Sequence, residues 1–223
     1  MNTTDTGGPP DPGSVAQLTV NPVGGGGDRL LVLIHGYGAD ENDLAPLAPI
    51  IDQDGRFATI CPRGPIDLPF GGAAWYDRSD DGVIDQLSFC RSIILLDRMI
   101  DEITGANRFD PARTVIVGFS QGAAMTLALA LRETTRVRPA AVAALSGSIQ
   151  LPDWFTYDWK APDLPPVLQQ HGTHDPVVEI GRGHHTRSVL QEHGIDLEYR
   201  EYPMQHEITQ DSIADLQSWL ADV

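Results

Sequence analysis

The sequence predicts an α/β protein: a mostly parallel sheet of about seven strands, helices on both faces, and no large cap domain. Three observations predict it. Short apolar segments alternate with helical ones, the segment at 30–34 is apolar at every position, and no proline- and glycine-rich linker divides the 223 residues into two core-sized halves. We therefore expect a single domain over residues 14–223, after a flexible N-terminus at 1–13.

The first part of the chain is expected to contribute three strands and a helix. Its elements are, in chain order, a strand near 16–20, a glycine-rich hairpin connection at 24–27, a strand at 30–34, a helix from Asp40 to about residue 51, and a strand at 57–61. The strand near 16–20 alternates apolar and polar residues. Asp40 is a typical helix cap, and acidic residues in the following turn favour a helix N-terminus there.

The rest of the chain alternates helices and strands. Its expected elements are a helix at 87–104, a strand at 114–117, a helix after Ser120, a strand at 141–145, a strand at 167–171, a helix at 179–192, a strand at 196–202 and a helix at 208–220. Apolar residues at helical spacing indicate the first of these helices. Two long irregular segments interrupt the pattern, at 62–86 and 146–166. The first has the length of a lid or binding loop.

The charge of the chain excludes some classes of partner. There are 15 basic and 31 acidic residues, a formal net charge of −16. Such a field repels nucleic acid and anionic membranes, so we expect no nucleic-acid partner and no stable membrane insertion. No apolar run has the roughly 18 residues of a membrane helix. The N-terminus lacks the basic and apolar parts of a secretory signal, which favours a cytoplasmic protein. The acidic excess reflects either a GC-rich genome or adaptation to high salt.

The segment at 114–125 carries the most informative motif, Gly118-Phe-Ser120-Gln-Gly122, between an apolar strand and a helix of small residues. Small residues at 118 and 122 permit a sharp strand-to-helix reversal. This turn projects the Ser120 hydroxyl out of the sheet, beside the N-terminal dipole of the next helix. The alternative is a helix-capping serine between two packing glycines. The strand–turn–helix context favours a nucleophile.

A serine hydroxyl is a weak nucleophile at neutral pH, so it needs a base and a group that orients the base. In folds with this turn the chain order is serine, then an acid, then a histidine. His206 follows the last expected strand, and Asp175 directly follows the strand at 167–171. We expect Asp175 to hold His206 in one tautomer and to stabilise its imidazolium when Ser120 attacks. The other histidines come too early in this order, or lie in or at the end of the helix at 179–192: His35, His171, His174, His184, His185 and His193.

The tetrahedral intermediate of such an attack needs hydrogen-bond donors for its oxyanion. We expect one from the backbone N–H of Gln121 and the other from Tyr37, in the glycine-rich loop after the strand at 30–34. The alternative for that loop is a plain strand-to-helix turn. A metal site at His171, His174 and Asp175 is a further alternative, but their spacing is not typical of zinc ligands.

Several motifs together resemble one family, the small α/β-hydrolases of the carboxylesterase, lysophospholipase and acyl-protein thioesterase group. The motifs are LIHGYGAD at 33–40, PRGP at 62–65, AWYD at 74–77, GFSQGAAM at 118–125, LSG at 145–147, HGTHDPVV at 171–178 and the His206 segment. The resemblance implies a triad of Ser120, Asp175 and His206 and oxyanion donors at Tyr37 and Gln121. It also implies no cofactor and no metal, and frequently a homodimer.

The long loop around AWYD has two interpretations. Trp75 and Tyr76 could wall an acyl pocket, with Leu68 and Phe70 beside them, or Trp75 could simply anchor the loop to the core. Aromatic residues at 154, 155 and 159 could form the far wall of that pocket or a dimer contact.

The sequence therefore predicts a serine carboxylesterase that hydrolyses short- to medium-chain carboxylic esters, small-molecule substrates, through an acyl-enzyme on Ser120. An acyl thioesterase or a lysophospholipase is the alternative within this class. A serine peptidase on the same fold and a non-catalytic binding protein are the alternatives outside it.

Overall fold

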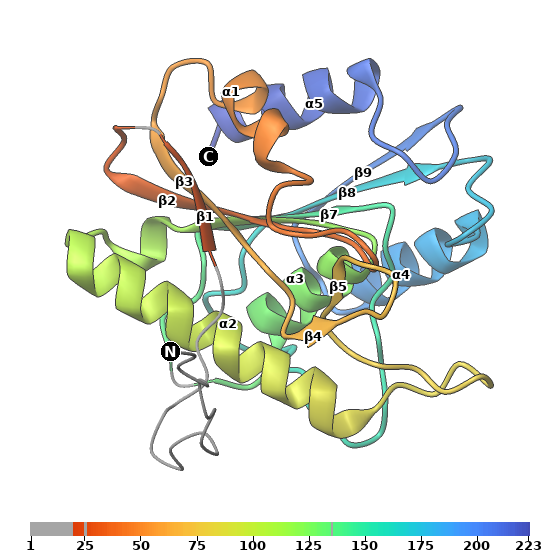
Figure 1. Ribbon diagram of the computed structural model, residues 1–223. Coiled ribbons are helices and arrows are strands. Elements are labelled where there is room, and N and C mark those ends of the chain that lie inside the picture. The colour runs from red at the N-terminus through yellow and green to blue at the C-terminus, as the bar shows by residue number, and fades with distance from the viewer. Residues whose placement is uncertain (1–19, 25, 135) are drawn as a thin grey trace, which may run out of the picture.

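The computed structural model describes residues 20–24, 26–134 and 136–223. Seven strands form the main sheet, in the order β1-β3-β2-β6-β7-β8-β9. The strands are β1 (Val20–Gly24), β2 (Arg29–Ile34), β3 (Phe57–Pro62), β6 (Val115–Phe119), β7 (Ala141–Leu145), β8 (Val167–Gly172) and β9 (Leu197–Tyr202). All neighbours are parallel except β1, which runs antiparallel to β3. The expected mostly parallel sheet is confirmed (Figure 1).

Helices cover both faces of the sheet, as the sequence predicts. α1 (Ala48–Ile51) and α5 (Gln210–Ala221) lie on one face, and α2 (Gln86–Asn107), α3 (Gln121–Leu131) and α4 (Ile180–Glu192) lie on the other (Figure 1). Two short 3-10 turns, η1 (Ala45–Leu47) and η2 (Pro111–Arg113), precede α1 and β6. The α/β-hydrolase fold is therefore the fold of this chain.

Each face of the sheet has its own hydrophobic core. On the α2/α3/α4 face, Phe89 and Met125 are fully buried against the even-numbered residues of β2, such as Val32. On the α1/α5 face, Leu216 packs with the odd-numbered residues, such as Leu33. Because successive side chains of a strand point to opposite faces, a strand covered on both faces is apolar throughout. This double burial explains the continuous apolar run of β2.

The parallel strands end at one edge of the sheet, and the loops that leave this edge carry the residues singled out above. The loop after β2 holds Tyr37, the turn after β6 holds Ser120, the turn after β8 holds Asp175, and the loop after β9 holds His206. Carboxyl ends of parallel strands are where sites assemble in open α/β sheets. Residues far apart in the chain are brought together by this topology.

Of the expectations for the N-terminal part, some lie outside the described residues and one is wrong. The strand near 16–20 and the N-terminus at 1–13 lie outside the described residues, apart from Val20, where β1 begins. The segment 24–27 is not a hairpin connection, because β1 pairs with β3 and not with β2. The glycine run joins two strands that are separated by β3.

The helix expected from Asp40 to residue 51 is wrong over most of its length. The Asp40 carboxylate does accept a hydrogen bond from the Asn42 amide, at 2.8 Å, but this closes a local turn. Regular helix is confined to η1 and α1, each of which has a proline at its start, Pro46 and Pro49. Proline has no N–H to donate and is tolerated only in the first turn of a helix, so two prolines three residues apart prevent one continuous helix.

The long segment 62–86 is less irregular than expected. It contains a second, two-stranded sheet made of β4 (Ile66–Asp67) and β5 (Ala73–Ala74). Beyond β5, Arg78 and Ile84 form an isolated bridge before α2 begins at Gln86. The segment 146–166 has no helix or strand, as expected.

Candidate active site

The turn at 118–122 is shaped by backbone packing. Ser120 has φ 55° and ψ −114°, a conformation that costs a non-glycine residue roughly 1–3 kcal/mol. A Cβ at Gly118 would lie 2.3 Å from the Gly122 oxygen, and a Cβ at Gly122 would lie 2.1 Å from the Ile34 oxygen. Both glycines are therefore required for the close approach of β6, α3 and β2. The Ser120 amide also donates to the Leu145 oxygen at 2.8 Å, which ties the turn to β7.

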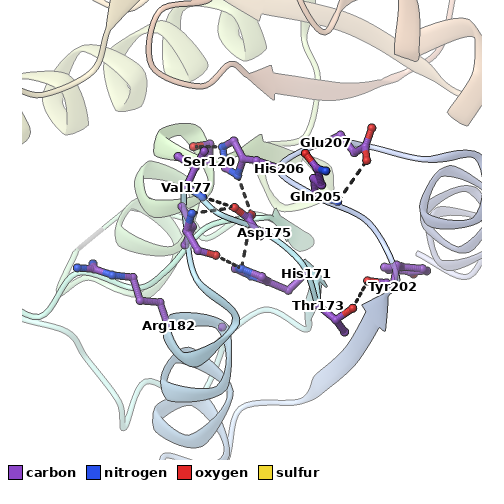
Figure 2. Close-up of polar contacts among 12 residues, drawn as sticks. Ser120, His171, Thr173, Asp175, Val177, Arg182, Tyr202, Gln205, His206 and Glu207 are labelled. Carbon is purple, nitrogen blue, oxygen red and sulfur yellow. Dashed lines mark hydrogen bonds and ion pairs between the residues drawn. The ribbon is translucent and has the colours of Figure 1, made fainter.

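Ser120, His206 and Asp175 form a continuous chain of hydrogen bonds (Figure 2). His206 Nε2 lies 2.9 Å from Ser120 Oγ, and His206 Nδ1 lies 2.7 Å from Asp175 Oδ2. The ring of Phe119 packs against the imidazole with 4.9 Å between centroids. With Nδ1–H donated to the carboxylate, Nε2 is left free to accept the serine proton. The arrangement can activate Ser120 as a nucleophile.

Asp175 sits in a dense set of hydrogen bonds. Its side chain is fully buried, and its Oδ1 accepts from the amides of Val177 and Val178, each at 2.8 Å. Its Oδ2 is the atom that faces His206. A buried carboxylate is costly unless donors surround it. Here two backbone amides hold closed the turn that carries Asp175, which we call the acid turn. They leave one carboxylate oxygen facing the imidazole.

His171 supports the same turn, and the sequence did not assign it this role. Its ring is fully buried, with Nε2 2.7 Å from the Val178 oxygen and 3.8 Å from Asp175 Oδ2 (Figure 2). With Nε2 protonated, His171 donates to Val178 and fixes the strand end to the far side of the turn. A histidine four residues before the acid, at the end of a buried strand, was the only sequence signal for it.

The two expected oxyanion donors are positioned beside Ser120. Gly36 approaches so closely that a Cβ there would lie 3.2 Å from the Ser120 Cβ. Gly38 has φ 82°, and its amide donates to the Ala73 oxygen. Within the described part of the chain, neither the Tyr37 amide nor the Gln121 amide has a hydrogen-bond acceptor. Tyr37 lines both cavities at Ser120 and Gln121 directly follows the serine, and two unpaired N–H groups so placed can bind a developing oxyanion.

The side chain of Gln121 has a structural role that was not predicted. Its Oε1 accepts from the Trp75 amide and its Nε2 donates to the Tyr76 oxygen, both at 2.7 Å. The Trp75 indole donates to the His35 oxygen at 2.9 Å. The two Gln121 bonds hold the segment 75–76 on the helix that starts next to Ser120, and we call these two bonds the Gln121 clamp. The indole bond ties Trp75 to the loop after β2.

The neighbouring His35 is buried and bonded on both ring nitrogens. Nδ1 lies 2.7 Å from the Gly36 oxygen, and Nε2 accepts from the Gly64 amide at 3.0 Å. Burial lowers the pKa of His35 below its usual value. With Nε2 accepting and Nδ1–H donating, the ring fastens the loop after β2 to the segment just beyond β3.

Two cavities meet at Ser120. The larger, about 450 Å³, is lined by Tyr37, Tyr76, Asp77, Arg78, Ser120, Gln121, Ala124, Ser148, Gln150, Val177, Val178 and Arg182. The smaller, about 380 Å³, is lined by Gly36, Tyr37, Gly38, Ala39, Asp43, Phe119, Ser120 and His206. Tyr37 and Ser120 are common to both. The reacting bond of a substrate would lie at their junction.

The predicted pocket residues differ in where they lie. Tyr76 is buried and lines the larger cavity. Leu68, Phe70 and Trp75 line neither cavity: Phe70 is 73% exposed, whereas Trp75 is fully buried and hydrogen-bonded. Trp75 therefore anchors its loop to the core, which was the alternative interpretation. The aromatic residues at 154, 155 and 159 are half-buried against the core and also line neither cavity.

The metal alternative finds no support in the donor geometry. His171 faces Val178 and Asp175, whereas the His174 ring lies against Thr173, at 3.3 Å from its hydroxyl. Among the described residues, no three histidine, cysteine or acidic side chains are grouped as metal ligands.

None of the helices in the described residues is long and apolar enough to cross a membrane.

Known proteins with similar sequences and folds include carboxylesterases and thioesterases. Probable carboxylesterase SOBER1-like from Arabidopsis thaliana is 30% identical over 172 residues, which cover 71% of this chain and 63% of that protein. Acyl-protein thioesterase 1 from Debaryomyces hansenii is 27% identical over 212 residues, covering 86% and 90%. The crystal structure of esterase PE8 superposes with a TM-score of 0.79 at 28% identity, covering 93% of this chain and all of that one.

Residues 19–223 match the model of the Phospholipase/Carboxylesterase family. The match spans the turn at 118–122, which we call the nucleophile turn, the acid turn and the loop that carries His206. The chain therefore belongs to the phospholipase/carboxylesterase family of α/β-hydrolases and is a serine hydrolase of the carboxylic-ester type.

Proposed function

We propose that this protein hydrolyses short- to medium-chain carboxylic esters through an acyl-enzyme on Ser120. The observation that carries the proposal is the hydrogen-bond chain, with Ser120 Oγ 2.9 Å from His206 Nε2 and His206 Nδ1 2.7 Å from Asp175 Oδ2. Both distances are short enough for direct proton transfer and tautomer control.

In the first half of the reaction, Ser120 Oγ attacks the ester carbonyl carbon while His206 takes the hydroxyl proton. The oxyanion accepts hydrogen bonds from the Tyr37 and Gln121 amides. His206 then gives the proton to the leaving alcohol, and Asp175 stabilises the imidazolium throughout. In the second half, water repeats the attack on the acyl-enzyme and releases the acid.

The position of His206 orients the substrate. His206 lines the smaller cavity and must reach the leaving oxygen, so the alcohol part occupies that cavity. The acyl part then occupies the larger cavity. A cavity of about 450 Å³ is in the lower half of the range of small-molecule sites, which favours short to medium acyl groups.

Hydrolysis of p-nitrophenyl esters from acetate to palmitate tests the proposal. We expect an optimum at short or medium length, and in Ser120→Ala a loss of kcat on the order of 10⁴-fold or more with an unchanged melting temperature. Ser218→Ala, a serine on the exposed face of α5, is the matched control and should retain full activity. A Ser120→Ala enzyme with more than about a tenth of wild-type activity would exclude Ser120 as the nucleophile.

A thioesterase is the second candidate, because relatives that align over most of this chain are named acyl-protein thioesterase 1. Measuring kcat/KM for an ester and a thioester of the same acyl chain distinguishes the two. A higher value for the thioester would favour the second candidate. The homodimer and the cytoplasmic location expected from the sequence stay predictions.

A further inference from the structure

The larger cavity carries an unusual charge for this chain. The protein as a whole has a net charge of −16, yet the cavity is lined by two arginines, Arg78 and Arg182, and a single carboxylate, Asp77. The smaller cavity differs: it is lined by the carboxylate of Asp43 and by His206, and by no arginine or lysine. The positive charge therefore lies on the acyl side of Ser120.

Neither arginine is neutralised by a carboxylate. In the described residues, seven other arginines form ion pairs: Arg63, Arg98, Arg113, Arg132, Arg136, Arg138 and Arg200. Arg78 and Arg182 have no acidic partner within 4.0 Å in the same part of the chain, although Asp77 is adjacent to one of them. Two guanidinium groups without a carboxylate partner therefore line one cavity of a strongly acidic chain.

Arg78 is held in place by neutral groups. Its guanidinium lies over the ring of Tyr76, 5.6 Å from the centroid, and donates to Gln150 Oε1 at 3.1 Å and to the Tyr76 hydroxyl at 3.4 Å. Gln150 is itself fixed, because its Nε2 donates to the oxygen atoms of Ser148. Arg78 therefore retains unused N–H groups in a defined orientation.

Arg182 projects from the first turn of α4 (Figure 2). No acceptor or carboxylate in the described residues bonds to its guanidinium. Burial raises the pKa of Tyr76, and the charges of Arg78 and Arg182 both oppose that rise. Both positive charges are thus felt at the Tyr76 hydroxyl, inside the cavity.

We propose that the cavity beside Ser120 selects acyl groups that end in a carboxylate, so that the preferred substrates are half-esters of dicarboxylic acids. This rests on the function proposed above, in which the acyl part occupies the larger cavity. A carboxylate can accept paired hydrogen bonds from a guanidinium, and such charge-assisted bonds are about twice as strong as neutral ones. It also supplies the anion that Arg78 and Arg182 lack.

The reaction balances as an ester hydrolysis. Ser120 Oγ bonds to the ester carbonyl carbon, the alkoxy oxygen leaves with the serine proton that His206 carries, and water then releases the acyl group from Ser120. One half-ester anion and one water give one alcohol, one dicarboxylate and one proton. No oxidant, metal or co-substrate is needed.

A matched pair of substrates tests the proposal. Monoethyl glutarate and ethyl 5-oxohexanoate have the same shape, but only the first carries a terminal carboxylate. We expect wild-type kcat/KM to favour monoethyl glutarate by about tenfold or more, measured by base uptake at constant pH. Arg78→Gln/Arg182→Gln should lower the ratio of the two kcat/KM values to about one.

Control variants separate charge from fold. Arg187→Gln removes an arginine from the same helix, but one whose guanidinium lies over Tyr199, 4.9 Å from the ring centroid, and it should keep the preference. Arg182→Lys keeps the charge and should keep most of the preference over the keto ester. Glutarate should also inhibit wild type more strongly than inorganic phosphate does.

The outcomes are distinguishable. Equal hydrolysis of the two esters by wild type, a preference that survives the double substitution, or stronger inhibition by phosphate would overturn the carboxylate proposal while leaving the esterase intact. If wild type hydrolyses neither ester nor any p-nitrophenyl ester faster than Ser120→Ala, the proposed function itself fails.

Discussion

The turn that presents Ser120 and the turn that presents Asp175 follow parallel strands at the same edge of the sheet, yet they are held in different ways. The nucleophile turn has no side-chain cap, and its shape depends on the close backbone approach of Gly118 and Gly122. The acid turn is closed by hydrogen bonds from Val177 and Val178 to one carboxylate.

This difference predicts how each turn fails. A turn held by backbone contact has no room for added atoms, so it is sensitive to a larger side chain. A turn held by hydrogen bonds tolerates an isosteric replacement that keeps the acceptor, and it is sensitive to the loss of a charge or a donor. Substitutions in the nucleophile turn should therefore lower the stability of the protein, whereas isosteric substitutions in the acid turn should lower its activity.

Asp175→Asn should show the largest effect, and on activity alone. The remaining amide oxygen can still accept from Val177 and Val178, but the amide nitrogen would face His206 Nδ1 and favour the wrong imidazole tautomer. We expect kcat for p-nitrophenyl butyrate to fall by about 10⁴-fold. The melting temperature should stay within a few degrees of wild type, and a large fall would show that the charge also holds the turn.

Gly122→Ala should show the opposite pattern. The new Cβ would meet the Ile34 oxygen at 2.1 Å, so β2 and α3 must move apart. We expect a loss of about 2–3 kcal/mol of unfolding free energy, measured by urea denaturation. Gly105→Ala is the matched control: it lies in α2 with nothing within 4 Å of the added Cβ, and it should stabilise the protein by about 0.5–1 kcal/mol. Equal effects of the two substitutions would contradict the comparison.

A smaller effect on unfolding free energy is expected when pH is lowered. It arises from His35, in the loop that packs against the nucleophile turn. Burial lowers the pKa of His35 in the folded protein below the value of 6.5 for the free side chain. As pH falls below about 6.5, the unfolded chain therefore binds a proton that the folded protein excludes, and stability decreases. Unfolding free energy measured between pH 7.5 and 5.5 should decrease in wild type, and His35→Gln should flatten this slope. An identical slope in both proteins would assign the decrease to other groups.

The parts of the site that follow from local sequence were predictable. The Gly118-x-Ser120-x-Gly122 pattern determines its own turn, and chain order with strand ends was enough to select Asp175 and His206 from many acids and seven histidines. The parallel topology explains why: residues that directly follow strands meet at one edge.

The parts that depend on contacts between distant segments were not predictable. The pairing of β1 with β3 cannot be read from the glycine run, and the expected helix after Asp40 ignored Pro46 and Pro49. The sequence favoured neither a pocket wall nor an anchor for Trp75. The Gln121 side chain that accepts a hydrogen bond from the Trp75 backbone lies 46 residues away in the chain. The sequence alone could not show where an aromatic loop residue points.

The Gln121 clamp has a consequence for how the specificity of this enzyme can evolve. The side chain of Gln121, the residue after Ser120, bonds to Trp75 and Tyr76. The cavity wall at Tyr76 is therefore linked directly to the turn that carries Ser120. We expect a substitution that reshapes the wall there to shift the Gln121 backbone, the proposed oxyanion donor, as well. We therefore expect new substrate preferences to be acquired more readily at Val177 and Arg182, which line the cavity without bonding to Gln121. The part of the cavity at Tyr76 is thus bonded to the residue next to Ser120, whereas the part at Val177 and Arg182 is not.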